Sequence, residues 1–152
     1  MSIKKGPKSS GFSLIEVLIF ISVLSVFFVV AAAVTTAALR NLQVSEHRIM
    51  ATRYAEELAD WLRGQKEADW YSFSSVTSGT YCANADPLPG SIAGLTAGFC
   101  TVNGLTPAIF HREVTLTPAG QFVNIAIVVS WSELNSTYNY QIPITTQFTQ
   151  YE

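Results

Sequence analysis

One uninterrupted apolar run near the N-terminus restricts the folds that are open to this chain. From Leu14 to Leu39 the side chains are almost all aliphatic or aromatic, and only Glu16 is charged. These 26 residues exceed the roughly 20 that an α-helix needs to cross a bilayer. A chain of 152 residues fits one domain, or one domain with a membrane segment. A buried core helix of this length that is apolar on every face would be unusual in so small a protein. The run therefore predicts a helix inserted in a membrane.

The charges of the chain are divided by this run. Lys4, Lys5 and Lys8 precede it without any acid, whereas ten of the eleven acidic residues follow it. Positive flanks remain on the cytoplasmic side, so the N-terminus is expected in the cytoplasm and residues from Arg40 onward outside. Without residues 1–11 the chain holds 6 basic and 11 acidic residues, a formal net charge of −5. This balance argues against nucleic acid as a partner.

Two simpler interpretations of the run are a secretory signal peptide and a plain membrane anchor. Ala31, Ala32 and Ala33 imitate a signal cleavage site, but the apolar run is too long for a signal peptide and continues to Leu39. A plain membrane anchor is consistent with the length of the apolar run, but it does not explain Glu16. A carboxylate costs roughly 2.5–3.5 kcal/mol at the centre of a membrane helix and less near the interface, so the anchor stays open as an alternative.

The segment from Lys4 to Glu16 resembles the processing site of type IV prepilins and type II secretion pseudoprepilins. A short basic leader ends in Gly11 and is followed by Phe12, three residues and Glu16, which opens the apolar helix. The resemblance covers about residues 4–40. It implies that residues 1–11 are a leader peptide, that a prepilin peptidase cleaves between Gly11 and Phe12, and that the new amine of Phe12 is N-methylated.

The resemblance also implies that Glu16 is the carboxylate used in assembly. In the mature chain Glu16 lies one helical turn from the amine of Phe12, in its own chain or in a neighbouring subunit. Two charges 4 Å apart attract by about 4 kcal/mol at an effective dielectric constant of 20, which offsets the burial of the acid. The hydrophobic effect does not favour any one axial position of an apolar helix against its neighbour in lipid, because lipid tails are equally apolar. This charge pair would therefore set the axial stagger between subunits.

Helical periodicity continues beyond the apolar run. No Pro or Gly occurs between Arg40 and Arg63, and Gly64 is a residue type typical of the position after a helix end. We therefore expect one helix over residues 12–63, with residues 12–39 in the membrane and residues 40–63 amphipathic. Apolar residues spaced three and four apart form the stripe of the second half: Ala51, Tyr54, Ala55, Leu58, Trp61 and Leu62.

Residues 64–108 are rich in Gly, Ser, Thr, Pro and Asn and are expected to form an irregular connection. Both cysteines of the chain, Cys82 and Cys100, lie here, on the exported side. A disulfide is the expected state in an oxidising compartment and two unpaired thiols are the alternative. The bridge would add on the order of 3 kcal/mol of stability. Two cysteines with the distant His47 and His111 are too few ligands for a metal site.

From residue 109 to 148 the apolar residues alternate with polar ones, which predicts three antiparallel strands. The turn between the first two is expected at residues 118–120, and Pro143 places the third strand at a sheet edge or turns its N–H side outward. The predicted inner faces are Phe110, Arg112, Val114 and Leu116; then Ile125, Ile127, Val129 and Trp131; then Tyr138, Tyr140, Ile142 and Ile144. Covered by the amphipathic half-helix, these strands give an α+β head over residues 40–152, the plan that the pilin resemblance implies.

No arrangement of residues in the sequence indicates catalysis or a bound cofactor, so the chain is expected not to be an enzyme. The resemblance implies a filament subunit whose partners are other pilin subunits, prepilin peptidase, an inner-membrane assembly platform and membrane lipid. The precursor would lie in the inner membrane, and the filament in the periplasm or at the cell surface.

The composition of the apolar helix indicates the role within the filament, because residues Val17 to Val34 contain neither Gly nor Pro. Major type IV pilins usually carry both in this part of the helix, so a minor pilin or a pseudopilin is favoured. The alternative function is a single-pass anchored binding or adhesion domain on the outer side of the membrane, which does not polymerise.

Overall fold

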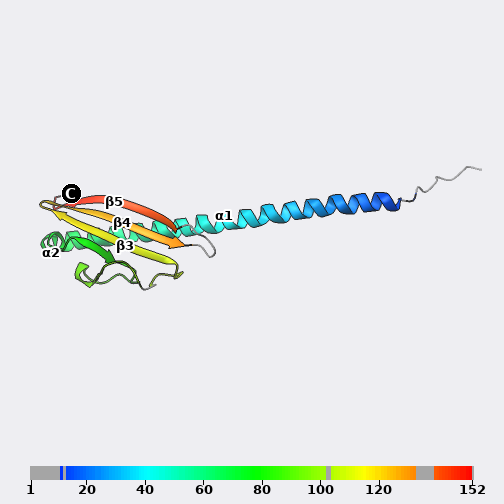
Figure 1. Cartoon of the computed structure of the whole chain (residues 1–152). Helices are drawn as coiled ribbons and strands as arrows, with labels where there is room; N and C mark the ends of the chain where they lie inside the picture. Colours follow the sequence, from blue (N-terminus) through cyan, green and yellow to red (C-terminus); the bar gives the residue numbers. More distant parts are fainter. Residues whose placement is uncertain (1–10, 12, 102–103, 133–138, 152) are drawn as a thin grey trace, which may run out of the picture. The chain divides into compact units, whose positions relative to one another are not determined.

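The computed structural model describes residues 11, 13–101, 104–132 and 139–151 (Figure 1). Most of the predicted leader, Phe12 and Tyr138 lie outside these residues. The contacts divide the chain into two compact units, one ending at Gln43 and the other beginning at Val44.

The first long element is helix α1, Leu14–Ala68, which contributes to both units. Up to Gln43 it carries the apolar run, and from Val44 it carries the predicted amphipathic stripe. Ala51, Ala55, Leu58 and Leu62 of this stripe are fully buried. Tyr54 and Trp61 are partly buried against the same core. The stripe prediction is therefore confirmed.

The predicted end of the helix at Arg63 is wrong, because α1 continues through Gly64 to Ala68. A glycine inside a helix costs about 1 kcal/mol relative to alanine. Packing of the next turn outweighs this cost: Lys66 is only 7% exposed, and its Nζ lies 5.6 Å from the centroid of the Phe148 ring. The start also differs by two residues, since the helix begins at Leu14 rather than at Phe12.

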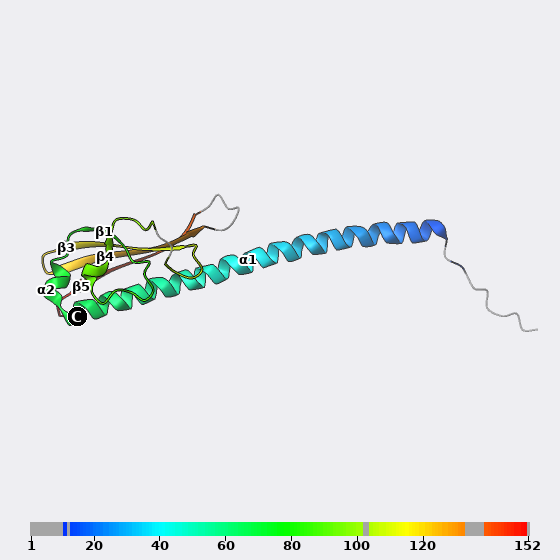
Figure 2. The same cartoon turned by 90° about the horizontal axis from the view of Figure 1, so that it is seen from below.

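The head contains one antiparallel sheet of five strands in the order β2-β1-β3-β4-β5. The strands are β1 Gly79–Cys82, β2 Thr96–Ala97, β3 Phe110–Ala119, β4 Phe122–Ser132 and β5 Asn139–Thr149. The last three are the predicted strands, whereas β1 and β2 were expected to be irregular. Figures 1 and 2 show the later part of α1 lying along one face of this sheet. The predicted α+β helix-on-sheet fold is confirmed.

The connection between α1 and the sheet is more regular than its composition predicts. It contains α2, Trp70–Ser74, and a single 3-10 turn, Ile92–Gly94. Asp69 caps α2 by accepting a hydrogen bond from the Ser72 backbone N–H at 3.1 Å. The Ser72 hydroxyl and backbone N–H together hold the pKa of the Asp69 carboxyl below its ordinary value.

The predicted turn between β3 and β4 is shifted by one residue. Ala119 still pairs with Phe122, so only Gly120 and Gln121 lie between the strands. Gly120 has φ +71°, a left-handed conformation that glycine adopts without a steric penalty. Pro118 lies within the last residues of β3 instead of in the turn.

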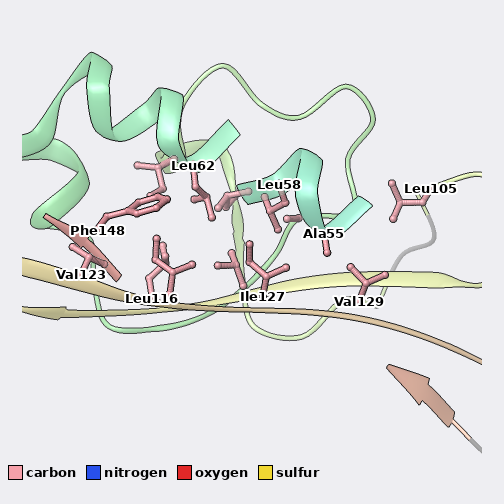
Figure 3. Close-up of a cluster of buried hydrophobic side chains, with 14 of the residues drawn as sticks. Ala55, Leu58, Leu62, Leu105, Leu116, Val123, Ile127, Val129 and Phe148 are labelled. Carbon is pink, nitrogen blue, oxygen red and sulfur yellow. The ribbon is translucent and has the colours of Figure 1, made fainter. Parts of the chain in front are cut away.

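The alternation of the three predicted strands is confirmed. Their inner-face residues pack on the helical stripe, and Figure 3 shows Leu58 and Leu62 pointing toward Leu116, Val123 and Ile127. Burying one such aliphatic side chain contributes about 1.5–3 kcal/mol. The buried strand residues are Phe110, Arg112, Val114, Leu116, Val123, Ile125, Ile127, Val129, Trp131 and Phe148.

Among the described residues, Arg112 is the one cation whose side chain is fully buried on this face. Its guanidinium donates from Nε to the Ala83 carbonyl at 2.8 Å, from Nη2 to the Ala85 carbonyl at 3.1 Å and from Nη1 to the Tyr54 carbonyl at 3.3 Å. Nη1 also lies 3.3 Å from Oε2 of Glu57. The sequence placed Arg112 on the inner face, and the structure shows that it joins α1 and the connecting segment to β3.

Asn84 completes this junction from the connecting segment. Its side chain accepts from the Arg112 backbone N–H at 2.6 Å and donates to the Phe110 carbonyl at 3.2 Å. Gly104 approaches so closely that a Cβ there would lie 2.1 Å from the Asn84 carbonyl oxygen. Only glycine fits at that position without a shift of the backbone.

We expect Arg112→Met to destabilise the head by about 3–5 kcal/mol, because it leaves Glu57 and the carbonyls of Tyr54, Ala83 and Ala85 without the donor they share. Glu57→Gln is the matched control. The Glu57 side chain is 47% exposed, so its loss should cost no more than about 1 kcal/mol. Denaturant unfolding of the full chain in detergent, followed by tryptophan fluorescence, measures both. Equal losses for the two variants would contradict the central role of Arg112.

Candidate functional site

The N-terminal end of α1 places Glu16 in the first helical turn. The backbone N–H groups of Glu16 and Val17 both donate to the Ser13 carbonyl, at 3.0 and 3.2 Å. An acidic side chain is favourable here because the unpaired N–H groups give a helix N-terminus a partial positive charge. Glu16 is exposed, and Gly11 and Ser13 lie just before the helix, exposed as well. Phe12 is outside the described residues, so the expected cleavage, methylation and charge pair stay predictions.

The surface of the first unit is apolar over the whole length of its helix. The best 18-residue window has a mean hydropathy of 3.0, and none of it is buried. Large side chains on every side of the helix are exposed, from 39% at Leu24 to 82% at Leu14. In length and composition the segment is able to cross a membrane, and burial against lipid or other helices would remove this apolar area from water.

The hydroxyl groups within this apolar surface are satisfied by the helix itself. Ser22 donates to the Ile19 carbonyl at 2.8 Å and Ser25 to the Ile21 carbonyl at 2.7 Å. Thr35 and Thr36 each donate to the carbonyl four residues earlier, both at 2.9 Å. A hydroxyl bonded in this way needs no water. These four are all the Ser and Thr residues between Leu14 and Gln43, so Glu16 is the polar group that most needs an outside partner.

Cys82 and Cys100 form the expected disulfide, with an S–S distance of 2.04 Å and Cα atoms 4.8 Å apart. The bridge joins β1 to the segment that follows β2. The Cys100 backbone N–H donates to Oε1 of Glu113 on β3 at 2.9 Å. The disulfide prediction is confirmed, and the bridge fastens the two strands that the sequence did not predict.

The two histidines of the head lie close to its packed core. The His47 ring lies edge-on to the Phe110 ring, with centroids 5.9 Å apart, and His111 is half-buried on β3. In the described part of the chain no three His, Cys, Asp or Glu side chains come together as a metal site. Burial lowers the pKa of the Arg112 guanidinium, and the nearby Glu57 carboxylate opposes this shift.

Hollows on the described part of the head include two of a few hundred Å³. One of about 400 Å³ lies beside α1 and is lined by Met50, Arg53, Tyr54, Glu57, Asp86 and Thr106. The other, of about 240 Å³, lies next to the disulfide and includes Leu95 and the exposed Phe99. The aromatic residues after α1 are mainly packing groups, since Phe73 is buried between Trp70 and Phe148, while Tyr71 is 81% exposed.

Arg112, Asn84 and Lys66 are the important residues of the head that sequence reasoning did not single out. For Arg112 a signal was present, because a charged residue stands at an inward position between Phe110 and Val114. Asn84 and Lys66 carried no comparable signal, since their roles come from contacts with residues 26 and 82 positions away.

Comparison with known proteins locates the functional signal in the N-terminal segment. No curated protein and no solved structure matches the chain. Residues 6–32 match the family model described as the prokaryotic N-terminal methylation motif, which includes Gly11, Phe12 and Glu16. The apolar helix and this motif together support a membrane-anchored precursor. The chain carries the N-terminal signature of type IV pilins and pseudopilins.

Proposed function

We propose that this chain is a structural subunit of a type IV pilus or a related pseudopilus, which polymerises through residues 12–39 after loss of its leader. The observation that carries the proposal is Glu16, in the first turn of a helix that is otherwise uncharged to Leu39. The methylation motif supports a pilin-like precursor with a structural, non-enzymatic role. It also implies other pilins and a prepilin peptidase as partners.

Processing would convert the N-terminus into the partner that Glu16 needs. Hydrolysis of the amide between Gly11 and Phe12 consumes one water, leaves a carboxylate on Gly11 and frees an amine on Phe12. That amine is protonated at neutral pH, and addition of a methyl group leaves its positive charge in place. The leader carries Lys4, Lys5 and Lys8, so its removal leaves this amine as the first cation of the mature chain.

Assembly would then depend on a single attraction in lipid. The carboxylate of Glu16 in one subunit and the Phe12 amine of a neighbour gain far more from each other in lipid than they would in water. From Val17 to Leu39 the surface of the helix offers no competing charged partner, and its four hydroxyls donate to its own carbonyls. The pair therefore selects one axial position of each subunit against the next.

A minor pilin or a pseudopilin is the favoured role within the filament. Between Val17 and Val34 there is neither Gly nor Pro, and α1 is helical throughout this stretch. An inner-membrane assembly platform would extract the subunit from the membrane into a periplasmic or surface filament. The alternative is an anchored head that never polymerises, and the two following experiments distinguish it from a filament subunit.

We expect Gly11→Val to abolish processing, because a branched side chain occupies the position next to the scissile bond. Mass spectrometry of the N-terminal peptide from cells that hold a prepilin peptidase should find wild-type chains beginning at methylated Phe12 and variant chains with the leader attached. Ser9→Ala, in the same leader, is the control and should be processed like the wild type. Wild-type chains that keep residues 1–11 would overturn the proposed processing.

We expect Glu16→Ala to leave membrane insertion intact and to reduce incorporation into sheared filaments at least tenfold. The lost attraction of about 4 kcal/mol at an effective dielectric constant of 20 exceeds the 1.4 kcal/mol of a tenfold change. Glu46→Ala is the matched control, since Glu46 is an exposed acid on the same helix beyond the apolar run. Immunoblots of membrane and filament fractions measure both steps. Normal incorporation of the Glu16 variant would contradict the charge-pair mechanism.

A further inference from the structure

Strand β5 forms one edge of the sheet and is long for an edge strand. Its 11 residues, Asn139–Thr149, pair with β4 along their whole length (Figure 1). Among the described residues no strand pairs with its other side. The opposite edge, β2, has two residues. A long edge strand presents unpaired backbone N–H and C=O groups to which another strand can add, and natural proteins usually block such edges.

The usual charged blocking groups are missing from β5. None of its residues is Lys, Arg, Asp or Glu, and several are β-branched. Its blocking residue is Pro143, near the middle. Pro143 pairs with Val128 in an unbroken register and has no N–H to donate, so its backbone nitrogen faces away from β4, toward the free edge. In an antiparallel strand alternate residues face the same way, so Gln141, Thr145 and Gln147 also direct their N–H groups outward.

A second β5 is the strand that fits this edge best. Two uncharged copies bring no like charges together, and full antiparallel overlap of residues 139–149 places Pro143 of each copy opposite Thr145 of the other. The two Pro143–Thr145 pairs at the centre of the new ladder would then each lack the N–H donor that proline does not have. We propose that Pro143 blocks the free edge of β5, which would otherwise pair with β5 of a second copy of this chain.

Pro143 can be replaced without disturbing the core, because its side chain is exposed on the outer face of the sheet. Pro143→Val returns two donors to a symmetric pair of strands. At the usual net strength of a backbone hydrogen bond, self-association should strengthen roughly 10- to 30-fold.

Pro118→Val is the matched control. Pro118 pairs with Val123, so its nitrogen also faces away from β4, at the end of β3. β1 reaches only as far as Leu116 on that side, so the free edge beside Pro118 is a few residues long. This substitution removes a strand proline without opening a long edge.

The test uses the full chain in detergent. Sedimentation over a concentration series gives the association constant, and hydrogen exchange locates the contact. In Pro143→Val we expect exchange at Gln141, Thr145 and Gln147 to slow as association increases, while the β4 amides stay protected as in the wild type and report an intact fold. Adding Thr145→Lys to Pro143→Val should restore weak association, because the new charges repel across the symmetric pair.

Unchanged association and exchange in Pro143→Val would overturn the proposal, and so would equal association in Pro118→Val. Slowed exchange elsewhere on the head, with the β5 edge unaffected, would also overturn it by assigning the contact to another surface. The proposal concerns the head alone and does not rest on the filament function. The filament experiments are carried out in cells with variants of Gly11 and Glu16. The filament proposal and the β5 proposal can therefore fail independently of each other.

Discussion

The packing of the apolar stripe of α1 on the sheet is the contact on which the head depends. Ala51 and Ala55 have no side chain beyond Cβ, and both are fully buried in the core that α1 shares with β3 and β4. Leu58 and Leu62 fill the space one and two turns later (Figure 3). An antiparallel sheet with one apolar face needs such a cover, and within the head α1 is the long element available to supply it. The strands alternate as they do because this helix lies on one side of them.

A single buried cation connects the remaining parts to this contact. The Arg112 guanidinium reaches carbonyls of α1 and of the connecting segment at once, and a planar group with five N–H donors suits that task better than a lysine would. The ion pair with Glu57 compensates part of the desolvation. Because a desolvated guanidinium without acceptors is costly, the connecting segment and β3 hold each other in one arrangement. The disulfide then adds a covalent link a few residues away.

The parts of the structure that sequence could predict are those governed by repeated local patterns. The apolar run, the stripe on α1 and the period-two strands each extend over ten or more residues, so single exceptions did not obscure them. The edge position of β5 followed from the missing N–H of Pro143. The disulfide followed from two cysteines in an exported segment. At the candidate site, the Gly11, Phe12 and Glu16 pattern was visible because its spacing is short and its setting unusual.

What could not be predicted depends on contacts between distant residues. The helix passes Gly64 because Lys66 reaches Phe148, which lies 82 residues later. Strand β1 forms beside β3, and its four residues give too short a pattern to recognise in a segment rich in turn formers. Arg112 was placed on the correct face, but its acceptors lie in segments whose path was unknown. In each case tertiary packing outweighed a local preference.

Phe148 has a consequence for how the head opens. The last strand of a chain, at the edge of a sheet, is ordinarily where fraying begins at little cost in free energy. Here the ring of Phe148 is buried against Phe73, and the cationic groups of Arg63 and Lys66 lie 5.9 and 5.6 Å from its centroid. Detaching β5 from its C-terminal end therefore requires separating it from α1 at the same time. Fraying of β5 at this end therefore breaks core contacts as well as strand pairing, which raises its cost in free energy.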